Sequence, residues 1–276
     1  MYGAILGDII GSPYEYDKGK KRKDLPLFCG QSRVTDDTMM TVAVADALMS
    51  EPDPYDDDSL RYAFINRMRY WGRLYPGVGY GSAFRKWLIS ENPKPYESYG
   101  NGSAMRVSPV GWLFDTLDLT RHIAALSAEV THNHPEGIKG AEAVASAVYL
   151  ARTGSSKDDI AAYISDEFHY NLDRTIEEIR PGYRMNATCQ GSVPEAMIAF
   201  LESTSFEDTI RTTISLGGDT DTTSAIAGSI AEAFFGIPRG LKEEVFRYTR
   251  PCVQKVIRAF TACAEAGRET AIVKAS

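Results

Sequence analysis

The chain has 276 residues, 43% of them hydrophobic, which is enough to bury a large core as one large domain or two small ones. Its formal net charge of −7 argues against nucleic acid or an anionic membrane surface as a general partner. No apolar stretch reaches the roughly 20 residues that span a bilayer, and the opening "MYGAILGDIIG" lacks the basic start of a signal peptide. The four scattered cysteines fit reduced thiols better than disulfides or a zinc site, so we expect a cytoplasmic protein.

The opening segment is predicted to be a helix in which Gly3, Gly7 and Gly11 recur every four residues. Residues at this spacing lie near one face of a helix, and glycine weakens a helix unless something is gained from it. We expect the gain to be the close approach of another backbone. A loop with Glu15 follows, and the basic run at 18–24 is interpreted as a solvated loop.

Two adjacent carboxylates precede the next predicted helix, residues 38–50, in the stretch "RVTDDT". Helix capping explains one aspartate or threonine there, because its side chain accepts the free N–H groups of the first turn. Capping does not explain Asp36 and Asp37 together. On a formed helix neighbouring side chains diverge by about 100°, so two aspartates converge only where the backbone is not yet helical.

Helices are next predicted at 59–75 and 137–154, where apolar residues recur near every 3.6 positions. Between them lies "SYGNGSAMRVSP" at 98–109, with Asn101, Gly102 and Ser103 ahead of a possible helical turn. Such a backbone can present N–H groups to phosphate oxygens. Asn-Gly is also an ordinary turn, so this motif alone is weak evidence of a binding site.

Aromatic and histidine residues in this part of the chain have simple explanations. Tyr75, Tyr80 and Trp87 are candidates for one wall of a binding site, but aromatic residues are most often buried for their area, and we prefer core packing. His132 and His134 form an H-x-H pair without a third strong nitrogen or sulfur ligand. We therefore interpret them as surface or hydrogen-bonding histidines, not metal ligands.

The last third of the chain is predicted to hold helices at 192–203, 223–236 and 243–267. The helix at 223–236 presents a face of small residues, like the opening helix. Alternating runs of strand length are nearly absent from the sequence. The predicted fold class is therefore all-α, with a single domain over residues 1–276.

A second acidic pair, Asp219 and Asp221, lies in "SLGGDTDTTSAIAG" at 215–228, with a threonine after each aspartate. If the two acidic clusters meet, their carboxylates repel and take up protons unless a cation neutralises them. Carboxylate and hydroxyl oxygens without histidine or thiolate favour Mg²⁺ or Mn²⁺ over zinc. Composition alone leaves solvated helix caps as the alternative, because nothing in the sequence shows that the clusters meet.

Five motifs occur in order along the chain: G-D-x-x-G-x-x-x-E, T-D-D-T, G-N-G-x-x-M-R, T-H and G-G-D-T-D-T-x-x-A-x-x-G. In this order they resemble the ADP-ribosylglycohydrolase family, which includes the activating glycohydrolase of dinitrogenase reductase. The resemblance runs from Tyr2 to about Pro238, nearly the whole chain. The last motif is highly specific, and five motifs in the family's order are not expected by coincidence.

The resemblance implies an all-α fold that holds two Mg²⁺ or Mn²⁺ ions. It assigns metal ligation to both acidic clusters, that is, to Thr35, Asp36, Asp37, Asp219, Asp221 and Thr222. It assigns contact with the substrate to Asn101, Gly102, Ser103 and Met105, around a diphosphate and its distal ribose, and to His132. Glu15 matches an acidic residue that acts on water or gates the site, so the expected catalytic residues are Glu15, Asp36 and Asp219.

The same resemblance implies cleavage of the bond between C1 of the distal ribose of ADP-ribose and an acceptor. The expected partner is an ADP-ribosylated protein or a small ADP-ribose conjugate. Such a bond breaks through an oxocarbenium-like transition state. Two metal ions can bind the ribose hydroxyls and lower the pKa of a bridging water, and Glu15 can relay a proton if its pKa is raised. A metal-free glycosidase with two carboxylates is disfavoured, because the carboxylates here occur in clusters with threonines.

Two other classes of protein stay open from the sequence. One is a phosphoester or diphosphate hydrolase with the same two-metal chemistry, and the other is a non-catalytic ADP-ribose-binding protein.

The acceptor group of the ADP-ribose conjugate is open too. Arginine-linked substrate is the first choice, because a guanidinium-linked ribose suits an acidic protein and the best-known bacterial relatives act on that linkage. O-linked serine or acetyl conjugates come next, supported by His132, which matches family members with that preference.

Overall fold

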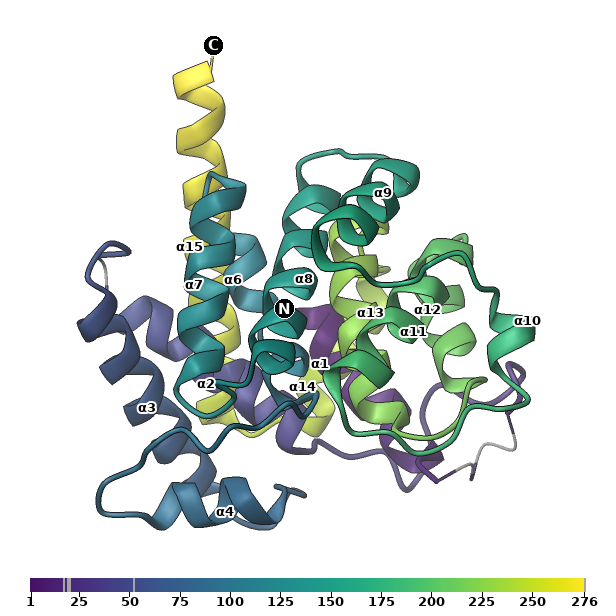
Figure 1. Cartoon of the computed structure of the whole chain (residues 1–276), viewed down its shortest axis with the longest axis horizontal. Coiled ribbons are helices and arrows are strands. Elements are labelled where there is room, and N and C mark those ends of the chain that lie inside the picture. The colour runs from purple at the N-terminus through teal and green to yellow at the C-terminus, as the bar shows by residue number, and fades with distance from the viewer. Residues whose placement is uncertain (17, 19–20, 52, 276) are drawn as a thin grey trace.

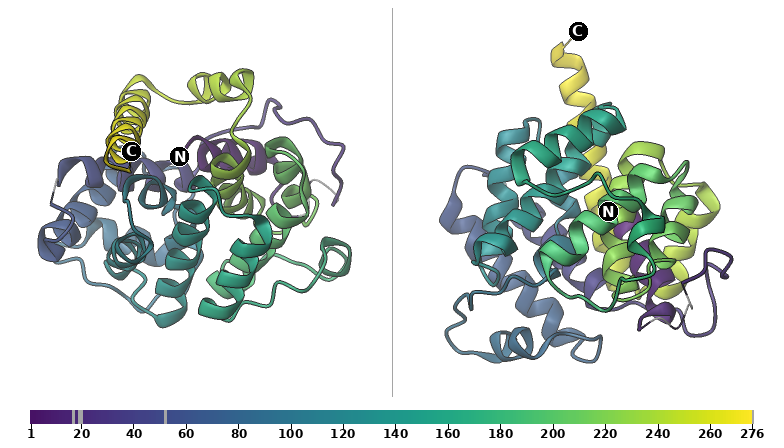
Figure 2. Two further views of the ribbon diagram at one scale, coloured as in Figure 1. Left: turned by 90° about the horizontal axis from the view of Figure 1, so that it is seen from above. Right: turned by 45° about the vertical axis from the view of Figure 1, so that its right-hand side comes forward.

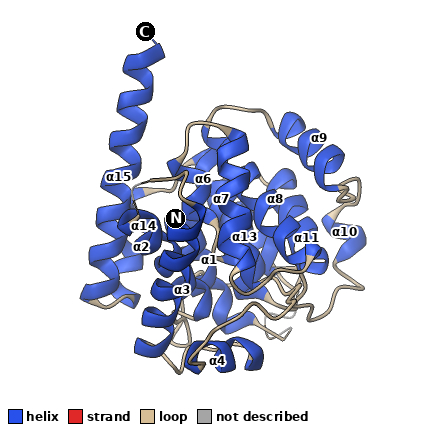
Figure 3. Cartoon of the chain, turned by 60° about the vertical axis from the view of Figure 1, so that its left-hand side comes forward, coloured by secondary structure: helices blue, strands red, loops and turns tan. Residues whose placement is uncertain are grey.

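The computed structural model describes residues 1–16, 18, 21–51 and 53–275, and the regular structure in this part of the chain is helical (Figure 3). In chain order the helices are α1 (Tyr2–Gly11), η1 (Ser12–Tyr14), α2 (Asp36–Ser50), α3 (Asp57–Leu74), α4 (Ser82–Ile89), α5 (Gly102–Met105), α6 (Ser108–Leu113), α7 (Leu117–Glu129), α8 (Pro135–Arg152), α9 (Lys157–Phe168), α10 (Ile176–Ile179), α11 (Cys189–Glu202), α12 (Phe206–Ile214), α13 (Thr220–Phe235), α14 (Arg239–Tyr248) and α15 (Pro251–Ala275). An isolated β-bridge between Gly100 and Thr188 joins two loops. The predicted all-α fold class is confirmed.

Most helices predicted from apolar periodicity are found to within one turn at each end. The predictions at 38–50, 59–75, 137–154, 192–203 and 223–236 correspond to α2, α3, α8, α11 and α13. The prediction of one helix over 243–267 is wrong, because the chain forms α14 and α15 there. Thr249 is extended, with φ −110° and ψ 143°, and Pro251 starts the new helix. Proline disfavours helical backbone in the residue before it but fits the first turn of a helix.

The opening helix packs against α13 by direct backbone contact, as the glycine spacing predicts. In Figure 1, α1 (purple) lies in the middle of the molecule beside α13. A Cβ atom on Gly3 would lie 2.0 Å from the carbonyl oxygen of Gly228, and one on Gly7 would lie 2.0 Å from that of Ser224. No side chain fits at these distances, so glycine lets the helices approach closely. This packing brings Asp8 of α1 to the start of α13.

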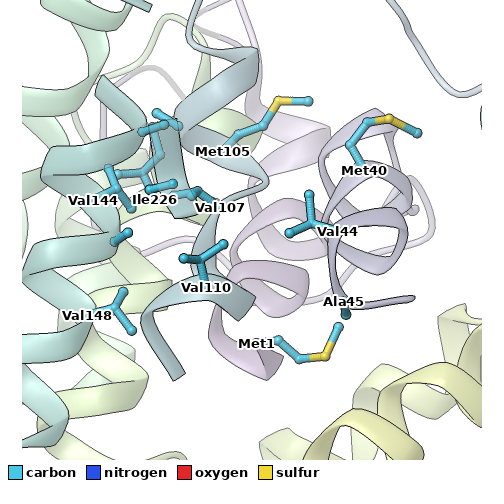
Figure 4. Close-up of a cluster of buried hydrophobic side chains, with 14 of the residues drawn as sticks. Met1, Met40, Val44, Ala45, Met105, Val107, Val110, Val144, Val148 and Ile226 are labelled. Carbon is cyan, nitrogen blue, oxygen red and sulfur yellow. The ribbon is translucent and has the colours of Figure 1, made fainter. Parts of the chain in front are cut away.

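A hydrophobic core holds the neighbouring helices in place around this pair. Figure 4 shows a cluster of buried aliphatic side chains from α2, α6, α8 and α13, which includes Val44, Val110, Val144, Val148 and Ile226. Full burial of such a side chain stabilises the fold by about 1.5–3 kcal/mol relative to exposure. The core thus fixes α2 and α13 relative to each other, and these helices carry the two acidic clusters at their N-termini.

The C-terminal helix α15 packs against α2 and α6, and its far end projects away from the other helices (Figures 1 and 2). None of the described helices is both long enough and apolar enough to cross a membrane.

The loop between η1 and α2 contains the basic run at 18–24, of which residues 19–20 lie outside the described residues. The interpretation as a solvated loop holds for Arg22, which forms an exposed pair with Asp24 at 2.5 Å. Lys21 differs, because its Nζ donates to the carbonyl oxygens of Arg180 and Tyr183 at 2.6 and 2.5 Å. This lysine therefore ties the loop to the segment that follows α10.

Candidate active site

A cavity of about 470 Å³ opens where the N-termini of α2, α5 and α13 come together. Its lining includes most of the predicted site residues, namely Glu15, Asp36, Asp37, Asn101, Gly102, Met105, His132, Asp219, Asp221 and Thr222. Met40 and Met105 of the core also reach this cavity, and both are labelled in Figure 4. Residues far apart in the sequence are thus gathered around one space.

The Asp8 carboxylate joins α1 to the start of α2. It is fully buried and accepts the backbone N–H groups of Thr35 and Thr38 at 2.9 and 3.1 Å. It also accepts the hydroxyl of Thr35 at 2.7 Å and that of Thr38. Burial raises the pKa of Asp8, and these donors lower it. Thr35, predicted as a metal ligand, lies beside the cluster but does not line the cavity, because its hydroxyl is directed at Asp8.

The two acidic clusters of the sequence meet in space. Carboxylate oxygens of Asp8, Asp37 and Asp221 lie within 4.8 Å of one another, and so do those of Glu15, Asp219 and Asp221. Asp221 belongs to both groups and therefore links them. The question that the sequence left open, whether the clusters converge, is answered by this arrangement.

Asp219 is not a helix cap, although it stands at the N-cap position of α13. Its side chain makes no capping hydrogen bond. Instead it accepts the Nδ2–H of Asn101 at 2.8 Å, and the same amide donates to Ser192 at 3.0 Å. Gly217 and Gly218 precede it with φ of 76° and 73°, values that favour glycine. This turn and the Asn101 amide together hold the Asp219 carboxylate at the cavity.

The crowding of carboxylates raises their pKa values. Burial and the neighbouring acids raise the pKa of Asp36 to about 7, and the same causes raise those of Asp37 and Asp221 well above the usual range. Asp37 Oδ1 is buried and has no hydrogen-bond partner among the described residues. An orphaned buried carboxylate oxygen among converging acids fits a bound cation. Because the donors are all oxygens, they suit Mg²⁺ or Mn²⁺.

Glu15 lies at the edge of the cavity in the loop after η1. The backbone N–H of the next residue, Tyr16, donates to the carbonyl oxygen of Gly218 at 3.0 Å, which anchors this loop beside Asp219. Tyr16 itself has φ 58°. Burial and the charge of Asp219 raise the pKa of Glu15, while Arg33, 3.6 Å away, lowers it. A raised pKa makes this carboxyl group a better proton acceptor than an ordinary glutamate.

His132 lines the cavity, and His134 does not. His132 is 6% exposed, and its Nδ1 lies 2.7 Å from the hydroxyl oxygen of Thr131. Burial and the charge of Arg106 lower its pKa well below the usual range. His134 caps α8, since its Nδ1 accepts the N–H of Glu136 at 3.1 Å. The interpretation of both as hydrogen-bonding histidines is confirmed.

The Ser103 hydroxyl lies away from the cavity, and the two aromatic residues Tyr80 and Trp87 are buried. The Ser103 hydroxyl, predicted to contact substrate, does not line the cavity and donates to the Gly137 carbonyl at 2.7 Å. Trp87 packs on Phe84 with ring centroids 5.4 Å apart, as core packing predicts. Tyr80 is 2% exposed but also lines the cavity, and its buried hydroxyl has no partner in the described part of the chain.

Asp8 is the site residue that the sequence analysis missed. A charge that interrupts an apolar helix of the core is a detectable signal, because an ionised group is buried only when it is paired or hydrogen-bonded. Its position one residue after Gly7 placed it on the helix that contacts α13 most closely. Arg106 is also fully buried. Like Asp8, it stands in one of the five motifs, and the motif alone predicted no role for it.

Comparisons with known proteins agree with this geometry. The chain is 28% identical to ADP-ribosylhydrolase ARH3 of Mus musculus, with 94% of this chain and 90% of that protein covered. It is 24% identical to ADP-ribosylarginine hydrolase Tri1 of Pseudomonas putida, with 86% and 70% covered. A solved structure described as an ADP-ribosylglycohydrolase-related protein complex has the same fold, with a TM-score of 0.70 and 22% identity over 95% of each chain.

The family model described as ADP-ribosylglycohydrolase matches residues 1–269. Curated relatives at 27–28% identity, which include the human ADP-ribosylhydrolase ARH3, match most of the chain. The resemblance drawn from the five motifs is confirmed. The chain belongs to the ADP-ribosylglycohydrolase family and is a hydrolase.

Proposed function

We propose that this protein is a metal-dependent hydrolase that cleaves the bond between C1 of the distal ribose of ADP-ribose and an acceptor. The observation that carries the proposal is the convergence of two acidic groups on Asp221, beside an Asp37 oxygen that has no donor in the described part of the chain. Charge repulsion among these carboxylates is relieved by cations that bind them. The expected product is free ADP-ribose.

The residues that would hold the ions come from the starts of two helices. The proposed ligands at the start of α2 are Asp36 and Asp37, and those at the start of α13 are Asp219, Asp221 and Thr222. They supply carboxylate and hydroxyl oxygens only. Thr35, whose hydroxyl donates to Asp8, would support the α2 ligands from behind the cavity. When bound, two such ions supply Lewis acidity toward ribose hydroxyls and lower the pKa of water. Asn101 fixes the direction of the Asp219 carboxylate through its amide, and Asp8 fixes the start of α2 through Thr35 and Thr38.

Glu15 is the proposed proton-transfer residue. Its carboxylate lies near Asp219 and Asp221, and its loop is anchored to Gly218 through Tyr16. Its raised pKa makes it a stronger base than an ordinary glutamate, which suits a group that takes a proton from water and passes it on. Gly102, the first residue of α5, and His132 line the remaining cavity, where they would contact the ADP-ribose. The N–H groups of Gly100 and Asn101 are already bonded, to Ser98 Oγ and to the Ala187 carbonyl oxygen.

We propose arginine-linked ADP-ribose as the first substrate. The acidic residues of the cavity and the negative net charge suit a guanidinium leaving group, and one relative is named an ADP-ribosylarginine hydrolase. O-linked substrates, ADP-ribosylserine or O-acetyl-ADP-ribose, are the second candidate, because His132 lines the cavity and matches family members that prefer them.

A side-by-side assay tests these assignments. The protein is mixed with arginine-linked, serine-linked and acetyl-linked ADP-ribose, with Mg²⁺ or Mn²⁺, and the products are separated by chromatography. Free ADP-ribose from the arginine-linked substrate supports the first choice, and release from O-linked substrates alone supports the second. AMP as the product would identify a diphosphate hydrolase. Tight ADP-ribose binding without release from any of the three would identify a binding protein.

A further inference from the structure

Arg106 is a buried cation whose hydrogen-bond partners are neutral. It lies directly after α5 and is 1% exposed. Its Nη2 donates to the carbonyl oxygen of Ser127 at 2.8 Å and to the hydroxyl oxygen of Thr131 at 2.9 Å. Nε has no partner, and no carboxylate pairs with this guanidinium among the described residues. Burying an unpaired charge is costly, so packing alone does not account for an arginine here.

Thr131 connects this cation to His132. The guanidinium has donors only, so the Thr131 oxygen accepts from it. The Thr131 hydroxyl hydrogen is then left for another acceptor, and His132 Nδ1, 2.7 Å away, is the acceptor within range in the described part of the chain. Nδ1 therefore accepts a hydrogen bond. A neutral imidazole whose Nδ1 accepts carries its proton on Nε2.

The Nε2 side of His132 is open toward the cavity. A Cβ atom on Gly102 would lie 3.2 Å from Nε2, and one on Gly100 would lie 3.6 Å from it. The loop before α5 thus passes close to the ring with no side chain at these two positions to cover it. The titratable groups that face the ring are Arg106 and Tyr96, whose ring centroid lies 6.0 Å away. Neither is an anion at neutral pH. Arg106 is a cation, and burial raises the pKa of Tyr96 to about 12, so its hydroxyl stays protonated.

We propose that Arg106 is a positioning residue that acts through Thr131 to hold His132 as the neutral Nε2–H tautomer, which gives the cavity a fixed N–H donor. The ligand group that this donor fits is an acceptor oxygen of ADP-ribose, on phosphate or ribose. The guanidinium polarises the Thr131 hydroxyl, which strengthens each bond of the chain, and it also disfavours an imidazolium beside it. The tautomer follows from the contacts alone, whereas the ligand role rests on the proposed function.

The tautomer is tested by NMR on the intact protein. Two-bond ¹H–¹⁵N correlation spectra distinguish the two neutral tautomers and the imidazolium for each of the four histidines, and a His132→Gln variant assigns the signal. We expect Nε2–H from about pH 5 to 8, where an ordinary histidine titrates. Thr131→Ser keeps the hydroxyl and should keep this spectrum, whereas Thr131→Val should show both tautomers. An Nδ1–H form or an imidazolium in the wild type at pH 7 would overturn the proposal.

The ligand role is tested by calorimetric titration with ADP-ribose. In Thr131→Val the His132 Nε2–H donor is no longer held in place, so we expect the affinity for ADP-ribose to fall roughly threefold to tenfold. The affinity of Thr131→Ser should stay within about twofold of the wild type. Thr120→Val is the matched control, because the Thr120 hydroxyl donates to the Thr116 carbonyl within α7. Should Thr131→Val fail to fold, as judged by circular dichroism, Thr131→Ala takes its place.

Unchanged affinity in the folded Thr131 variant would overturn the ligand role. If the wild type bound no ADP-ribose at all, the proposed function would fail together with that role, and the NMR spectrum would still decide the tautomer. A wild type that binds ADP-ribose but shows the Nδ1–H tautomer would refute the inference and leave the proposed function standing. The two failures are therefore distinguishable.

Discussion

The carboxylate of Asp8, on α1, accepts both the backbone N–H and the hydroxyl of Thr35, at the start of α2, with distances of 2.9 and 2.7 Å. Asp8 therefore holds the fold together at the place where the carboxylates repel. Asp36 lies in the same cluster, and no hydrogen bond from its side chain supports a neighbouring element in the described part of the chain. The two aspartates should respond oppositely to neutralisation.

We predict that Asp8→Ala lowers the melting temperature of the metal-free protein, whereas Asp36→Asn raises it at pH 8. Asp8→Ala leaves buried N–H groups without an acceptor, at about 1–3 kcal/mol each. Asp36→Asn removes a charge that burial and neighbouring acids oppose. Both variants should lose turnover. Thermal melts in EDTA measure the effect, with exposed Asp118→Asn, in the first turn of α7, as the control. Lower melting temperatures for both site variants would contradict this assignment.

The metal-free protein should become less stable as the pH rises from about 5 to 8. The pKa of Asp36 is about 7 in the folded chain against 3.8 for an ordinary aspartate, so the folded state binds more protons than the unfolded state between these values. Stability falls with pH wherever the folded state holds the extra protons. Mg²⁺ or Mn²⁺ should flatten this dependence. Denaturant titrations across this pH range, with EDTA and with metal, measure it, and a metal-free stability that rises with pH would oppose the prediction.

Chelation should abolish hydrolysis, and Mg²⁺ or Mn²⁺ should restore it. The reason is that every proposed ligand is a carboxylate or a hydroxyl, which are donors for hard cations. Ca²⁺ should bind yet support the reaction poorly, because its looser coordination misplaces water and ribose. The measurement is ADP-ribose release after dialysis against EDTA, followed by addition of each ion. Full release of ADP-ribose by the EDTA-treated enzyme would contradict the two-metal proposal.

Glu15→Gln should separate binding from chemistry. The amide keeps the size of the side chain but cannot exchange a proton, so we expect kcat to fall by roughly 10²-fold or more. The affinity for ADP-ribose and the metal-induced rise in melting temperature should stay close to those of the wild type. Kinetics and calorimetry on the same preparation test this. Normal turnover in this variant would remove Glu15 from proton transfer.

Gly7→Ala should weaken metal binding although Gly7 is not a proposed ligand. The added methyl group would lie 2.0 Å from the Ser224 carbonyl oxygen, so α1 and α13 must move apart, at a cost of about 1–3 kcal/mol. This movement separates Asp8 from Asp221, and we expect weaker metal binding as well as a lower melting temperature. Gly240→Ala in α14 is the control, because a Cβ there meets nothing within 4 Å. Equal metal affinity in both variants would contradict the coupling of helix spacing to the site.

The sequence predicted the elements whose patterns are local. Apolar periodicity located α2, α3, α8, α11 and α13, and the glycine spacing predicted the close contact of α1. It did not separate α14 from α15, because the apolar period continues across Pro251 although the backbone breaks before it. The acidic motifs indicated a cation site, but their convergence depends on helix packing, which no local pattern contains.

The residues whose surroundings the sequence did not reveal depend on tertiary contacts. The role of Asp8 in holding the start of α2 follows from the hydrogen bonds that Thr35 and Thr38 donate to it, and these residues are far from it in the sequence. Ser103 matches the motif, but its hydroxyl is directed to Gly137, a contact that depends on where α8 lies. Tyr80 is buried, as core packing predicts, and it also lines the cavity. A motif identifies residue types, and packing decides which atoms face the ligand.

The contact between α1 and α13 also sets the order in which the molecule can assemble. Gly3 and Glu232, which share a hydrogen bond across this contact, are 229 positions apart in the sequence. At about 5–20 residues per second, a ribosome needs roughly 10–50 seconds to make the intervening chain. During that time the glycine face of α1 has no partner, and Asp8 has no Asp221 beside it. An ion that requires both acidic clusters can stabilise the finished fold, but it cannot guide the early stages of folding.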